Sequence, residues 1–121
     1  MTFERNGVTK RSSPKPPRYK LWMRPEVHSA RKRLPGQVRQ RIRRALDNLG
    51  RDPRPARSET LRLPDAVESS IRTEWEVRRM RLADWRVVYA VNETWQEVAV
   101  LAIRKRPPYD YADLEELLSE L

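Results

Sequence analysis

Residues 75–91, WEVRRMRLADWRVVYAV, have the pattern of two strands joined by a tight turn. The second half is rich in aromatic and β-branched residues, which suit a pleated and half-buried surface. Ala83 and Asp84 form a short break of hairpin length between the two halves. This stretch therefore predicts a β-hairpin at the centre of the fold.

Side chains alternate between the two faces of a strand. In the second strand one face carries the large apolar side chains, namely Trp85, Val87, Tyr89 and Val91. Arg86 stands on the other face, where a charge is costly unless a counter-charge meets it. Two interpretations stay open: Arg86 binds an anionic ligand, or it forms a salt bridge to Asp84 or to a helix carboxylate.

The length of 121 residues predicts one domain with a small core. The absence of cysteine excludes a disulfide framework, a zinc ribbon and a thiol nucleophile, and it fits a reducing cytoplasm. The first residues lack the apolar core of a signal peptide. No stretch approaches the roughly 20 apolar residues of a membrane span.

Positive charge is concentrated in the first half of the chain. The net charge is +9, and residues 1–60 carry 17 basic and 5 acidic side chains, against 9 and 12 in residues 61–121. Arginine dominates, and its planar fork suits bidentate contacts with phosphate. Nucleic acid or an acidic protein is the expected partner, although an arginine-rich proteome would give the same composition.

The remaining elements follow from periodicity. Residues 1–18 predict a disordered basic arm, either passive or in contact with RNA, and residues 19–121 the folded domain. Within the domain we expect a short strand over 19–23, two amphipathic helices over 25–34 and 36–49, and a proline-rich loop over 51–70. The hairpin over 75–91, a third long strand over 97–106 and a C-terminal helix over about 110–121 follow. The fold class is α+β: an antiparallel sheet of about four strands, with the two N-terminal helices on one face.

The segment RLADWRVVYAV, followed by VAVLAIRKR and a tyrosine pair, resembles the RelE/ParE superfamily of toxins from type II toxin–antitoxin systems. The RelE branch is the most similar, and the resemblance covers roughly residues 19–121. It implies a RelE-like fold and a toxin that cuts mRNA in the ribosomal A site through attack by the ribose 2′-OH. It also implies a cognate antitoxin and neither a cofactor nor a metal.

The usual catalytic sets are missing. The chain has one histidine, no cluster with metal-ligand spacing and no glycine-rich phosphate loop. By alternation Arg79 and Arg81 share one face of the first hairpin strand, and Arg104 and Arg106 share one face of the last strand. If the helices cover the face of Trp85 and Tyr89, we expect these arginines to converge with Arg86 on the open face. Such guanidinium groups suit the negative charge that develops in phosphoryl transfer.

The resemblance assigns roles to individual residues. Arg86 matches the arginine that holds the scissile phosphate, Arg106 matches a second catalytic arginine, and Arg79 and Arg81 match a basic pair on the preceding strand. Either Tyr109 or Tyr111 matches a tyrosine that stacks on the base or assists proton transfer. Four more residues are candidates for RNA contacts, namely Arg43, Arg78, Arg104 and Lys105.

The chain departs from the RelE pattern on the first hairpin strand. Val77 and Arg79 occupy places where lysines are expected, and Lys105 points away from Arg106 by alternation. Arginine is a poor base because it hardly deprotonates. Two rivals therefore stay open: a ParE-like inhibitor of DNA gyrase, and a non-catalytic RNA- or protein-binding module of the same fold.

Overall fold

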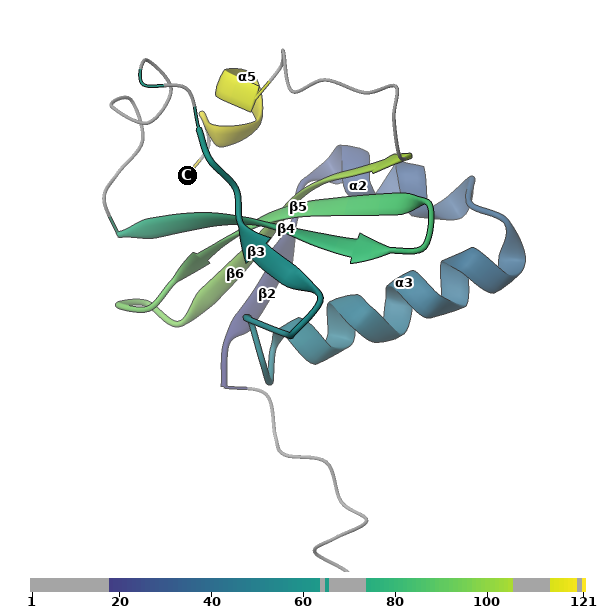
Figure 1. The fold of residues 1–121 in the computed structure, drawn as a ribbon, viewed down its shortest axis with the longest axis horizontal. Helices are drawn as coiled ribbons and strands as arrows, with labels where there is room; N and C mark the ends of the chain where they lie inside the picture. The colour runs from purple at the N-terminus through teal and green to yellow at the C-terminus, as the bar shows by residue number, and fades with distance from the viewer. Residues whose placement is uncertain (1–17, 64, 66–73, 106–113, 120) are drawn as a thin grey trace, which may run out of the picture.

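The computed structural model describes residues 18–63, 65, 74–105, 114–119 and 121. These residues form a five-stranded sheet with two helices on one face and a short helix on the other (Figure 1). The strands are β2 Lys20–Met23, β3 Ser58–Thr60, β4 Trp75–Leu82, β5 Trp85–Asn92 and β6 Glu97–Lys105. The α+β architecture is confirmed, with five strands in place of about four.

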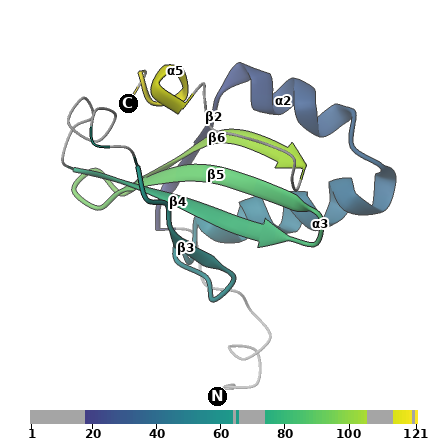
Figure 2. The same ribbon diagram turned by 45° about the horizontal axis from the view of Figure 1, so that its top comes forward.

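The strand order across the sheet is β2-β6-β5-β4-β3 (Figure 2). The hairpin of β4 and β5 is confirmed, with Leu82 paired to Trp85 across a turn of Ala83 and Asp84. β6 pairs antiparallel to β5, whereas β2 pairs parallel to β6. The sheet is therefore antiparallel as predicted except at the edge formed by the N-terminal strand, where the prediction is wrong because β2 and β6 form a parallel pair.

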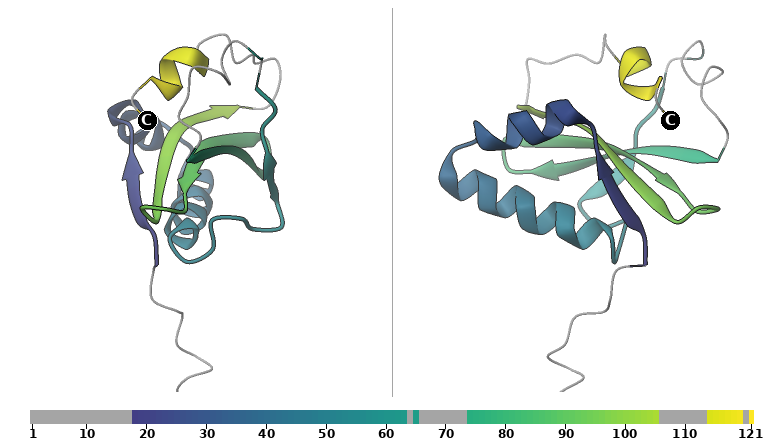
Figure 3. Two further views of the ribbon diagram at one scale, coloured as in Figure 1. Left: turned by 90° about the vertical axis from the view of Figure 1, so that its left-hand side faces the viewer. Right: turned by 180° about the vertical axis from the view of Figure 1, so that it is seen from behind.

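Two helices form the predicted N-terminal pair. α2 spans Pro25–Lys32 and α3 spans Gly36–Leu49, and both cover the same face of the sheet (Figure 3). Proline suits the first turn of α2 because the missing N–H has no partner there in any helix. The apolar stripe of α3 is buried in the main core through Ile42, Leu46 and Leu49.

The sheet separates two apolar clusters. The larger cluster packs on α2 and α3, and we call this side of the sheet the α2/α3 face. The smaller cluster lies under α5, Leu114–Leu118, on what we call the α5 face. Leu117 and Leu118 supply the buried contacts of α5, and the partly buried Leu61 and Leu63 join this cluster.

Arg24 fastens α5 to the start of α2. Its side chain is buried, and Nη1 donates hydrogen bonds to the carbonyls of Glu116 at 3.1 Å and Leu117 at 3.2 Å. Nε and Nη2 of the same guanidinium bond the carboxylate of Glu26. Arg24 thereby satisfies carbonyls at the end of a helix that has only one turn.

The prediction of an uninterrupted loop over residues 51–70 is wrong. β3 lies within this range and pairs antiparallel to β4, with Glu59 opposite Arg79. A strand of three residues is too short for alternation to reveal it, and the nearby prolines favour a loop assignment. The predicted basic arm lies outside the described residues except for Arg18.

Candidate phosphate-binding face

Three arginines stand side by side on the three central strands, one residue pair from the β4–β5 turn. Arg81 on β4 pairs with Arg86 on β5, and Arg86 pairs with Arg104 on β6. Directly opposed side chains lie on the same face with their Cβ atoms about 5 Å apart. We call Arg81, Arg86 and Arg104 the arginine row.

The arginine row lies on the α5 face. In β5 the neighbours of Arg86 in alternation, Val88 and Ala90, belong to the cluster under α5, whereas Val87 and Tyr89 belong to the cluster under α2 and α3. Arg86 therefore projects away from the helix pair. Like charges directly opposed on one face repel each other, so this row favours an anion as its counterpart.

A β-bulge in β6 brings Arg104 into the row. Counted by strict alternation from Val98, which faces α2 and α3, Arg104 would lie on the α2/α3 face. The register shifts within the β5–β6 pair, and both Leu101 and Ala102 belong to the cluster on the α5 face. The bulge thus turns Arg104 toward Arg86, in keeping with the role of bulges in re-aiming side chains.

The arginines of the row differ in their surroundings. Arg86 is buried, and its Nη1 donates to the carbonyls of Ala83 at 3.0 Å and Trp85 at 2.9 Å. Within the described part of the chain these acceptors are backbone carbonyls, and neither Asp84 nor a helix carboxylate forms the salt bridge considered above. Arg81 is exposed, and its side chain has no hydrogen bond or ion pair with a described residue.

Arg79 lies on the same face as the row, two positions before Arg81. It forms an ion pair with Glu59, its cross-strand partner on β3. Glu59 was missed by the sequence interpretation because its strand was missed. In the sequence, β3 is marked only by the three polar residues Ser58–Thr60, and a segment that short cannot be recognised as a strand. Glu59 brings a carboxylate, which can accept a proton, to the edge of the arginine face.

Two of the other candidate residues lie on the opposite side of the sheet. Arg78, a predicted RNA contact, is buried beside β3, where Nη2 donates to Ser58 Oγ at 2.9 Å and Nη1 donates to Glu76 Oε2 at 2.8 Å. Lys105 is exposed and pairs with Trp85, which packs on the α2/α3 core. Neither side chain joins the arginine row.

Arg43 is exposed on α3, away from the row. Arg106, Tyr109 and Tyr111 lie outside the described residues. Among the residues that the structure describes, no group of histidine, cysteine and carboxylate side chains is placed to hold a metal ion. None of the described helices is long and apolar enough to cross a membrane.

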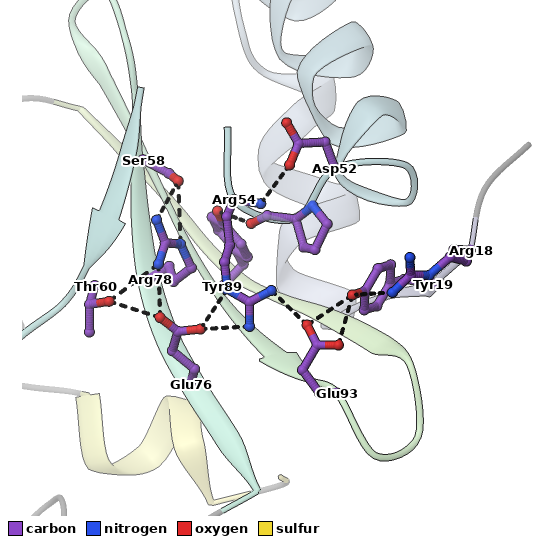
Figure 4. Close-up of polar contacts among 11 residues, drawn as sticks. Arg18, Tyr19, Asp52, Arg54, Ser58, Thr60, Glu76, Arg78, Tyr89 and Glu93 are labelled. Carbon is purple, nitrogen blue, oxygen red and sulfur yellow. Dashed lines mark hydrogen bonds and ion pairs between the residues drawn. The ribbon is translucent and has the colours of Figure 1, made fainter. Parts of the chain in front are cut away.

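A polar network fixes the segment before β3 against the sheet (Figure 4). Arg54 donates to Glu76 Oε1 at 3.0 Å and to Glu93 Oε2 at 2.6 Å, and Tyr19 donates to Glu93 as well. The hydrogen bond from Arg54, followed by that from Tyr19, lowers the pKa of Glu93. The pKa of Arg54 is raised, chiefly by its hydrogen bond to Glu93.

Burial opposes ionisation of Glu76, but its hydrogen bonds prevail. Thr60, Arg78 and Arg54 all donate to its carboxylate, and together they hold the pKa of Glu76 below its ordinary value. Burial raises the pKa of Tyr89, whose hydroxyl donates to the carbonyl of Pro53 at 2.6 Å. This network stays ionised near neutral pH and lies on the side of the sheet opposite the arginine row.

Comparison with protein families identifies one family. The sequence profile described as "ParE toxin of type II toxin-antitoxin system, parDE" matches residues 23–107. A search of curated proteins gave no match.

Several solved structures of RelE toxins, alone or with an antitoxin, share this fold. The archaeal RelE–RelB complex from Pyrococcus horikoshii is similar with a TM-score of 0.63 and 23% identity, over 76% of this chain and 99% of that one. The RelBE2 complex from Mycobacterium tuberculosis gives 0.57 and 18%, over 74% and 99%. The isolated E. coli RelE toxin gives 0.55 and 19%, over 85% and 99%. At these identities the likeness shows the fold, which is RelE-like.

Proposed function

Because the chain belongs to the ParE toxin family of type II toxin–antitoxin systems, with a RelE-like fold, we propose that it is a toxin that cleaves mRNA on the ribosome. The observation that carries this proposal is the arginine row on the α5 face. Three guanidinium groups on neighbouring strands, one of them anchored to the backbone, offer a cationic surface for an RNA phosphate.

The reaction needs little chemistry from side chains. The ribose 2′-OH attacks the adjacent phosphorus, the bond to the 5′-oxygen of the next nucleotide breaks, and the products end in a 2′,3′-cyclic phosphate and a 5′-OH. Arg86 and Arg81 hold the phosphate and stabilise the charge that develops on its oxygens. Anchoring of Arg86 to two carbonyls keeps its guanidinium in place before the substrate arrives, which lowers the entropy lost on binding.

Two protons must also move. Arginine is unsuited to removing the 2′-OH proton because it remains protonated. Glu59 is a carboxylate on the arginine face, and we assign it as a candidate base that Arg79 orients. Arg106 and one of Tyr109 and Tyr111 remain proposals for the leaving-group side of the reaction, on the basis of the resemblance.

The proposed partners follow from the same assignment. Two of the similar solved structures are RelE-type toxins bound to RelB or in RelBE complexes. We infer a cognate antitoxin for this chain, with acidic residues that cover Arg86 and Arg106, and a ribosome with mRNA in its A site as the target. Action on ribosomes implies a cytoplasmic location.

A second function has one observation in its favour. The matching profile is described by the name ParE, and ParE-like toxins inhibit DNA gyrase. That function needs a cationic surface but no convergence of groups on one phosphate. A module that binds RNA or protein without catalysis is the remaining alternative.

Primer extension on an mRNA undergoing translation separates these functions. Cuts at defined codon positions, lost about a hundredfold or more in Arg86→Ala and in Arg81→Gln, are the expected result. Arg39→Gln, which changes an exposed arginine on α3, serves as the control and should cut normally. Intact messages together with inhibition of gyrase supercoiling would establish the ParE-like function instead. Intact messages and active gyrase, with RNA binding retained, would leave the binding module.

A further inference from the structure

A second cationic site lies on the other side of the sheet. A hollow of about 480 Å³ opens between α3, the segment that precedes β3, and Met80 of β4. Arg41, Arg44, Arg51 and Arg57 line it, with Asp52 as the carboxylate among the lining residues. We call this hollow the basic pocket.

Three of these four arginines have no carboxylate partner in the described part of the chain. The side chains of Arg41, Arg44 and Arg57 form no hydrogen bond or ion pair with a described residue. Asp52 accepts a hydrogen bond from the backbone N–H of Arg54 at 3.1 Å. Guanidinium groups gathered around a concavity raise the local concentration of anions, and they are available to bind one.

The pocket wall is held in one conformation by the network of Figure 4. Arg51, Asp52, Pro55 and Arg57 come from the segment that Tyr89 bonds through the carbonyl of Pro53. In the same segment Arg54 bonds Glu76 and Glu93, and Ser58 donates to the carbonyl of Pro55 at 2.8 Å. A wall fixed in this way loses little conformational entropy when a ligand binds.

The basic pocket is distinct from the arginine row. Met80 lines the pocket and belongs to the core under α2 and α3, whereas the next residue, Arg81, projects onto the α5 face. The sheet therefore separates the two sites.

The lining favours peptide over RNA. None of the described residues that line the pocket is aromatic, so among them an unpaired base has no ring on which to stack. Instead Ala45 and Pro55, both half-buried, supply small apolar surfaces between the arginines. Carboxylates flanking a small apolar side chain would complement this arrangement.

We propose that the basic pocket binds an acidic peptide segment of a partner protein. Its carboxylates bond Arg41, Arg44 and Arg57, and a small apolar side chain rests on Ala45 and Pro55. This binding does not depend on RNA cleavage, because the two sites are on opposite sides of the sheet. A chain without nuclease activity therefore keeps it.

The test uses the full chain and a fluorescein-labelled acidic peptide, DEEVAEDE, with fluorescence anisotropy as the readout. Arg41→Gln/Arg44→Gln should weaken binding about tenfold, the loss expected from two charge-assisted contacts. The matched control is Arg33→Gln/Arg39→Gln, which removes the same charge from exposed positions outside the pocket and should stay within about twofold. Replacing the central valine of the peptide with serine should weaken binding to the unaltered chain.

Three outcomes would overturn the proposal. The peptide does not bind, or the two double variants lose the same affinity, which would indicate attraction by net charge alone. The third is loss of single-stranded RNA binding in Arg41→Gln/Arg44→Gln with peptide binding intact, which would make the pocket an RNA site. If the double variant does not fold, Arg57→Gln, a single change at an exposed residue, tests the proposal instead. It should weaken peptide binding about threefold.

Discussion

Arg81 and Arg86 are neighbours in the arginine row, but only Arg86 is tied into the fold. Arg86→Ala removes two hydrogen bonds to carbonyls and a buried aliphatic stem, and it should lower the free energy of unfolding by about 1–3 kcal/mol. Arg81→Gln changes an exposed side chain and should stay within about 0.5 kcal/mol. Urea unfolding followed by tryptophan fluorescence measures both. Equal losses would contradict the described difference in their surroundings.

Tyr89 is fully buried, and its hydroxyl reaches the carbonyl of Pro53. Tyr89→Phe leaves that carbonyl without its donor, so we expect a loss of about 1–2 kcal/mol in the free energy of unfolding. The same unfolding measurement applies. Tyr19→Phe is the comparison, because the Tyr19 hydroxyl bonds Glu93, which is exposed and can turn to water; its effect should be smaller.

For single residues, the alternation of side chains in β5 was sufficient to predict on which face of the sheet Arg86 lies. It was not sufficient for Arg104, because the bulge near Leu101 reverses the alternation, and both faces of that strand are apolar in sequence. Glu59 could not be found, since three residues do not make a pattern. The roles given to Arg106, Tyr109 and Tyr111 remain predictions.

Among the elements, the β4–β5 hairpin has a strained turn. Ala83 has a φ of 53°, a left-handed conformation in which a side chain is unfavourable by about 1 kcal/mol. Ala83→Gly should therefore raise the free energy of unfolding by about 0.5–1 kcal/mol, as measured by thermal unfolding. Asp84→Gly is the control, since Asp84 is not among the described residues with positive φ, and it should bring no gain.

α5 depends strongly on Arg24 for its attachment to the rest of the fold because the helix is short. A helix of five residues has few internal hydrogen bonds, so its stability comes from tertiary contacts. Arg24→Met keeps much of the stem but removes the bonds to the carbonyls of Glu116 and Leu117. Hydrogen exchange of the α5 amides should become faster by about tenfold. Lys32→Met, an exposed change on α2, should leave that exchange unchanged.

The long elements could be predicted because each carries a period over many residues. The stripe of α3 and the alternation of β5 are examples, and both are confirmed. The pairing of β2 with β6 could not be read from sequence, because no local pattern specifies a parallel partner so far along the chain.

For the whole molecule, the polar network predicts sensitivity to acid. Glu76 and Glu93 both have pKa values below those of an unfolded chain, so they stabilise the fold above about pH 4.3, the unfolded value. This contribution is lost as the pH falls through the lower folded values. The free energy of unfolding should therefore drop between about pH 5 and pH 3.

Glu76→Gln/Glu93→Gln tests this link. The double variant should be less stable at pH 7 but should lose less stability on acidification, as measured by urea unfolding at each pH. A parallel decline in both proteins would assign the acid sensitivity to other carboxylates.

The parallel pairing of β2 with β6 sets the order in which the molecule can be completed during its synthesis. β2 is the first of the described strands to leave the ribosome, yet its neighbour in the sheet is the last of them to be made. The same last strand carries Arg104. A nascent chain that ends before β6 has an unpaired β2 and an arginine row without Arg104, so the sheet and the proposed phosphate-binding surface are both completed by the same strand.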